Sequence, residues 1–155
     1  MHNNPFNKAL LDPQMFAVSW ELVPGRGAKE AAQERTLALA QRAAAGGKIH
    51  AVSLTDNPGG TPAMSADFMG TEIKKMGIEP LVHLTCKDKN RNQIESQLYA
   101  LDRAGIKNLL VMSGDYPVSG YLGRPAPVFD LDPLHVLQLI SEMNRGLEYP
   151  AGSGT

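Results

Sequence analysis

The segment from residue 80 to residue 113, PLVHLTCKDKNRNQIESQLYALDRAGIKNLLVMS, holds the pattern that decides the fold. It begins with an apolar run, Pro80 to Thr85, and ends with a second one, Lys107 to Ser113. Between these runs, apolar residues recur at the three- and four-residue spacing of a helix face. Gly105 then stands where a helix commonly ends. The segment therefore predicts a strand, a helix and a second strand.

The same order of strand, loop, helix and glycine extends in both directions along the chain. From Phe16 to Val23 side chains alternate, which places Ala17, Ser19 and Glu21 on one face of a strand. Asp132 followed by Pro133 is typical of a helix start. We expect strands over 16–23, 49–55, 80–85 and 107–113, and helices over 28–45, 65–76, 90–104 and 132–144.

Strands that alternate with helices at intervals of roughly 30 residues imply crossover connections and a parallel sheet. A closed barrel of this kind needs eight strands and about 250 residues. The sequence therefore predicts an α/β fold of the (β/α)8 TIM-barrel type, with only about the first four βα units present in this chain. We assign this half-barrel to residues 16–146, with a loosely held lead-in over 1–15 and a flexible tail over 147–155.

Composition limits the function classes. The 155 residues are 43% hydrophobic and carry 15 basic against 16 acidic side chains, so charge gives no reason to expect nucleic acid or a membrane surface as partner. No apolar stretch approaches the roughly 20 residues that a membrane-spanning helix needs. The lone Cys86 excludes an internal disulfide and a cysteine-rich zinc site, and we expect no metal site. A cytoplasmic protein with a small-molecule or protein partner fits these features best.

Polar residues stand where each predicted strand ends, and parallel α/β folds bind ligands at the carboxyl ends of their strands. Glu21 is a candidate general acid, because an apolar neighbour such as Trp20 favours the protonated form of a carboxyl group. The alternative for Glu21 is an exposed strand-end carboxylate. His83 is either a core histidine bonded to the backbone or a site residue that shares its strand face with Thr85.

The residues Ser113-Gly114-Asp115 follow the last predicted strand. Gly114 allows the backbone to approach a ligand closely, and Asp115 then places a carboxylate beside it. A Gly-Asp turn is also common without any function, so the tripeptide alone leaves both interpretations open.

Four short motifs occur in the same order as in one known family. Val18-Ser-Trp-Glu21, Val52-Ser-Leu-Thr55, His83-Leu-Thr-Cys86 and Ser113-Gly-Asp-Tyr-Pro117 resemble the amino-terminal half of methylenetetrahydrofolate reductases. The resemblance spans about Phe16 to Asn144. It implies a (β/α)8 barrel with FAD at the strand ends, which reduces 5,10-methylenetetrahydrofolate to 5-methyltetrahydrofolate in one-carbon and methionine metabolism. The electron donor it implies is NAD(P)H or another reductant.

The resemblance also implies roles for single residues. Glu21 matches the glutamate that protonates the folate as its five-membered ring opens, and Asp115 matches an aspartate near both flavin and pterin. The positions that it places at the flavin are Thr55, His83, Ser113, Gly114, Asp115, Phe129 and Asp130.

Two departures from the family qualify these implications. Many members have Arg-Gly-Asp where this chain has Ser113-Gly-Asp115, which removes a cation that faces the flavin. A lone half-barrel would also expose both edges of its sheet, so we expect a homo-oligomer, a partner chain or a longer chain that completes the barrel. A catalytically silent folate- or flavin-binding or assembly module remains an alternative. A methyl-transfer component is disfavoured, because one cysteine offers no thiolate zinc site.

Overall fold

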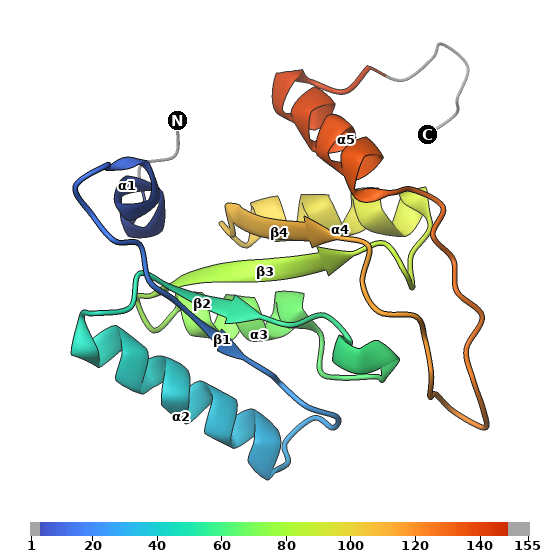
Figure 1. The fold of residues 1–155 in the computed structure, drawn as a ribbon, viewed down its shortest axis with the longest axis horizontal. Helices are drawn as coiled ribbons and strands as arrows, with labels where there is room; N and C mark the ends of the chain where they lie inside the picture. Colours follow the sequence, from blue (N-terminus) through green and yellow to red (C-terminus); the bar gives the residue numbers. More distant parts are fainter. Residues whose placement is uncertain (1–3, 149–155) are drawn as a thin grey trace.

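The computed structural model of the protein describes residues 4–148. It contains a parallel sheet of four strands in the order β1-β2-β3-β4, and Figure 1 shows all four arrows pointing the same way. The strands are β1 (Ser19–Leu22), β2 (Ala51–Leu54), β3 (Glu79–Thr85) and β4 (Asn108–Met112). The helices are α1 (Pro5–Leu11), α2 (Ala31–Gly46), the short 3-10 helix η1 (Pro58–Gly60), α3 (Ala66–Lys74), α4 (Arg91–Arg103) and α5 (Pro133–Arg145).

Each strand of the sheet pairs in parallel with the next strand along the chain. Trp20 pairs with Val52, Val52 with Pro80, and Leu81 with Asn108. One long helix separates each pair of strands, so every connection crosses over the sheet. This is the arrangement of the first βα units of a TIM barrel, which confirms the predicted fold class.

Helices α2, α3, α4 and α5 cover one face of the sheet and leave the other face uncovered by them, whereas α1 is bonded through Asn4 to Asn108 on that other face. Leu22, Val52, Leu54 and Val82 from the strands are buried on the covered face against apolar residues of α2 and α3. A second cluster joins β3 to α4 and α5, and its buried members are Leu84, Cys86, Ile94, Leu98 and Val136. Because side chains alternate along a strand, the residues between these core positions lie on the opposite, uncovered face.

Two predicted helix starts are confirmed by hydrogen bonds. The Gln93 amide donates to Oδ1 of Asn90 over 3.0 Å, and the His135 amide donates to Oδ1 of Asp132 over 2.9 Å. Each bond satisfies an amide in the first helical turn, where no backbone acceptor is available. Ser65 occupies the expected position before α3, but its side chain makes no capping bond.

The lead-in expected to be loosely held contains helix α1, so this part of the prediction is wrong. Pro5 stands in the first turn, where a missing amide hydrogen costs nothing, and the Asn4 side chain accepts from the Asn7 amide over 2.8 Å. Phe6 and Ala9 are buried, and Asn4 Nδ2 donates to Oδ1 of Asn108 at the start of β4. These contacts fix the segment to the sheet.

Two further predictions concern the start of the first strand and the tail. Strand β1 begins at Ser19 instead of Phe16, whose side chain is 87% exposed. Residues 149–155 of the predicted flexible tail lie outside the described residues.

The longest connection, residues 113–132, leaves β4 at the arrowhead end of the sheet, beside the loop that contains η1 (Figure 1). A hydrogen bond from the Val118 amide to the Gly60 carbonyl joins these two loops. Across residues 4–148, none of the helices has the length and apolar character needed to cross a membrane.

Candidate active site

The carboxyl ends of the four strands meet at one end of the sheet, where polar side chains gather into two groups. The first group lies on the uncovered face. Glu21 of β1 pairs in register with Ser53 of β2, and Ser53 Oγ lies 2.7 Å from Nε2 of His83 on β3. Ser53 and His83 are buried, whereas Glu21 is exposed. The role of Glu21 as a general acid stays a prediction.

His83 is 5% exposed, and its bonded partner is the Ser53 side chain instead of the backbone expected for a core histidine. Burial lowers the pKa of His83, and the negative charges of Glu21 and Asp56 act against this shift without cancelling it. A neutral imidazole carries one donor and one acceptor nitrogen, so His83 can orient a ligand without adding charge.

The second group joins the end of β2 to the end of β3. Oδ2 of Asp56 accepts from the Thr85 amide over 3.0 Å, from Thr85 Oγ1 over 2.7 Å and from Lys89 Nζ over 2.5 Å. Burial alone would raise the pKa of Asp56, but the Lys89 ammonium and the Thr85 bonds outweigh it and hold this pKa below its ordinary value of 3.8. Asp56 is therefore a carboxylate that ties the two strand ends together.

Lys87 belongs to the same group and is 1% exposed. Its Nζ donates to the Asp56 carbonyl over 2.8 Å and to Thr85 Oγ1 over 3.2 Å. Lys87 and Lys89 were not among the predicted site residues, because lysines that follow a strand are usually solvent-exposed. Thr85, Lys87 and Lys89 have the two-residue spacing of side chains on one strand face, and this spacing could have placed both lysines beside Thr85.

Gly114 passes directly over this second group. Its φ is +83°, and a Cβ added there would stand 2.9 Å from Thr85 Cβ and 3.1 Å from Lys87 Nζ. A side chain at position 114 would therefore clash as well as strain the backbone. The Gly114 backbone thus closely approaches Thr85 and Lys87, with the lysine beneath it. Its close approach to a ligand stays a prediction.

Asp115 accepts from the Gly59 amide over 2.8 Å and is exposed. Gly60 lies so close to the same segment that an added Cβ would stand 2.0 Å from the Tyr116 carbonyl oxygen. The loop after β2 and the loop after β4 are thus held together through these glycines, a link between distant segments that the sequence pattern does not reveal.

The remaining predicted site residues lie along the connection to α5. Phe129 packs against Tyr116 with ring centroids 5.4 Å apart. Asp130 accepts from the Arg91 backbone amide over 2.8 Å and from its Nε over 2.9 Å, and these bonds lower the pKa of Asp130 to about 2. Ser113 is exposed. The structure thus brings Glu21 near His83, while Asp130 is bonded to the start of α4.

Within residues 4–148, histidine, cysteine, aspartate and glutamate side chains form no group of three or more that could hold a metal ion.

The fold and the position of these polar groups define an α/β protein of the TIM-barrel type with its candidate site at the strand ends. The model of the methylenetetrahydrofolate reductase family matches residues 7–140, a range that includes all four strands. The chain belongs to this family of folate-related reductases. The match confirms the resemblance carried by the four strand-end motifs.

Proposed function

We propose that this chain supplies half of a barrel that binds FAD and reduces 5,10-methylenetetrahydrofolate to 5-methyltetrahydrofolate, with NAD(P)H or another reductant as electron donor. The observation that carries the proposal is the grouping of Glu21, Ser53 and His83 on the uncovered face at the strand ends. It puts a carboxyl group able to donate a proton beside a neutral ring able to orient a ligand.

The residues present fit a flavin. Oγ1 of Thr55 is buried and has no hydrogen-bond partner among the described residues. A buried hydroxyl without a partner costs about 1–3 kcal/mol, so a polar ligand atom in contact with it would stabilise the protein.

In this proposal Thr55, His83 and Gly114 hold the cofactor, together with Ser113 and Asp115 beside them. Phe129 and Asp130 contribute through the segment that they order. The flavin supplies hydride transfer, which no amino-acid side chain provides. The protein's part is to orient the two ligands, to exclude water and to move protons.

Glu21 is the proposed proton donor to the folate nitrogen that is released as the five-membered ring opens. Asp115 places a negative charge where the folate becomes cationic, which stabilises that charge. In the described half Glu21 is exposed, and in the completed barrel it would face the substrate.

We propose that residues 16–146 form this half-barrel and that a second copy completes it, with a partner chain or further residues of a longer chain as the alternatives. Among the described residues, β1 and β4 each pair with a strand on one side only. Since all strands are parallel, β4 of one copy can pair with β1 of another. Repeating this contact about a twofold axis gives eight strands.

The test is gel filtration of the purified chain with added FAD, followed by a folate reduction assay on Glu21→Gln. We expect the variant to retain FAD and to lose folate reduction, whereas Glu34→Gln, an exposed carboxylate on α2, changes neither. Folate reduction at an unchanged rate in Glu21→Gln would contradict the assigned role. Retained FAD or folate with no turnover in the unmutated protein would favour the silent binding module.

A further inference from the structure

Lys87 is the largest of the fully buried side chains among the described residues. Taking an ammonium group out of water is costly unless nearby groups compensate its charge. Its two hydrogen bonds go to uncharged oxygens, the Asp56 carbonyl and the Thr85 hydroxyl. The proposed proton donor and ligand contacts do not use this group.

The nearby carboxylates compensate the charge of Lys87 only in part. Asp56 is engaged by Lys89 at 2.5 Å. Oδ2 of Asp88 lies 3.8 Å from Lys87 Nζ, its side chain is 28% exposed, and it also accepts from Asn57 Nδ2 over 3.0 Å. Lys89 and Asp56 are partly buried, whereas Lys87 is fully buried. Asp115 also attracts the Lys87 ammonium group. Among the described residues, however, no carboxylate is a hydrogen-bond partner of Lys87, so its charge is not neutralised by direct contact.

The Lys87 ammonium group lies beneath the backbone that the proposed cofactor would contact. Lys87 Nζ is 3.1 Å from the position that a Cβ on Gly114 would take. Asp56, whose carbonyl accepts from Lys87, directly follows Thr55 in the chain. The Thr55 hydroxyl has no hydrogen-bond partner among the described residues. Ser113, on the other side of Gly114, carries no charge.

We propose that Lys87 is the cation of the flavin site, held beneath Gly114 so that its charge favours the more electron-rich reduced form of the cofactor. The inference rests on the proposed function, because it assumes that FAD binds at these strand ends. Lys87 acts in it through electrostatics and needs no direct contact with the reacting atoms.

The proposal is tested on the full chain with FAD, by the dissociation constant for FAD and the midpoint potential of the bound flavin. Lys87→Met should weaken FAD binding by on the order of tenfold, because it removes a positive charge close to the proposed cofactor, and should make the potential more negative. Lys87→Arg keeps the charge and should stay closer to the unmutated protein in both measurements.

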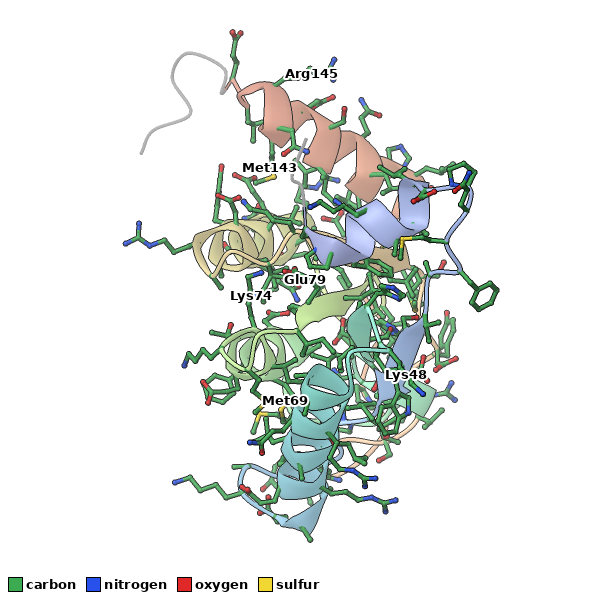
Figure 2. All side chains as sticks on the ribbon, turned by 90° about the vertical axis from the view of Figure 1, so that its left-hand side faces the viewer. Lys48, Met69, Lys74, Glu79, Met143 and Arg145 are labelled. Carbon is green, nitrogen blue, oxygen red and sulfur yellow. The ribbon has the colours of Figure 1, made fainter. Side chains whose placement is uncertain are left out.

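Asp88→Asn provides a test that does not remove a buried side chain. It deletes the partial compensation of Lys87, keeps an oxygen for Asn57, and should shift the potential in the positive direction, opposite to Lys87→Met. The matched control is Lys74→Met. Lys74 Nζ lies 3.1 Å from Glu79 at the amino-terminal end of β3, where Figure 2 shows the two residues close together. This variant removes a partly buried ammonium group away from the site and should leave the potential unchanged.

The outcomes separate the two proposals. Opposite shifts in Lys87→Met and Asp88→Asn, with none in Lys74→Met, support the role of Lys87. Unchanged potentials in a chain that binds FAD overturn that role and leave the proposed function standing. An unmutated chain that binds no FAD overturns the proposed function and this inference together.

Discussion

Oγ of Ser53 lies 2.7 Å from Nε2 of His83, so one side-chain hydrogen bond joins β2 to β3 on the face of the sheet that the helices leave uncovered. Both residues are about 95% buried. The bond fixes the orientation of the imidazole in the candidate site and contributes to the stability of the sheet.

Ser53→Ala removes this bond. We expect it to lower the free energy of unfolding by about 1 kcal/mol, since it leaves a buried ring nitrogen without its partner. Urea denaturation followed by circular dichroism measures the change. Ser19→Ala, at an exposed position on the same face, should stay within about 0.5 kcal/mol of the unmutated protein. A Ser53→Ala variant as stable as Ser19→Ala would show that the bond contributes nothing.

His83 should titrate below its ordinary value of 6.5, because burial outweighs the charges of Glu21 and Asp56. The unfolded chain then binds a proton that the folded chain refuses, so this group lowers stability as pH falls from 6.5 toward the folded-state pKa and contributes nothing above 6.5. Histidine proton NMR measures the value, with His83→Gln to assign the signal. Glu21→Gln should lower the His83 pKa further, and an unchanged or raised pKa would show that the two side chains are not coupled.

Asp56 should be the acid-sensitive link between the ends of β2 and β3. Asp56→Asn leaves the Lys89 ammonium buried without its counter-charge and should lower the free energy of unfolding by about 3 kcal/mol. In the unmutated protein the lowered pKa makes this contribution present above 3.8 and lost as pH falls through the folded-state pKa. Urea denaturation across acidic pH checks both points, with exposed Asp12→Asn as control.

Gly114 and Gly47 both need a positive φ, but only at Gly114 do neighbouring atoms also leave no room for a side chain. Both have positive φ, +83° and +64°, but an added Cβ meets Thr85 and Lys87 at position 114 and nothing within 4 Å at position 47. Gly47→Ala should cost about 1 kcal/mol of unfolding free energy for the left-handed backbone alone. Gly114→Ala should cost more, because the chain must also move away from β3. Equal losses in thermal or urea unfolding would mean that the close approach over Lys87 is not enforced.

The α/β class and the order of elements could be predicted because two signals agree throughout the chain. Apolar periodicity changes from strand to helix in each unit, and local residues such as Asn90 and Asp132 set the helix starts. The lead-in over 1–15 was not predicted to contain a helix. Pro5 nevertheless stands in the first turn of α1, and the contact of Asn4 with Asn108 holds that helix against the sheet.

The candidate site could be predicted only in part, for a physical reason. Strand ends are visible in a sequence, so Glu21, Thr55, His83 and Gly114 could be placed at one end of the sheet. The burial of Lys87 depends on three segments meeting in space. The bonding of Asp130 to Arg91 likewise joins residues far apart in the chain. A local sequence pattern does not show which distant segments contact one another.

Gel filtration of the purified chain with FAD, followed by visible absorbance, shows whether the strand ends bind the flavin and at what apparent mass. We expect FAD to elute with the protein, at the mass of two chains. Protein that elutes as a single chain, with all of the FAD emerging separately, would contradict the claim that these strand ends form a flavin site in a barrel completed by a second copy.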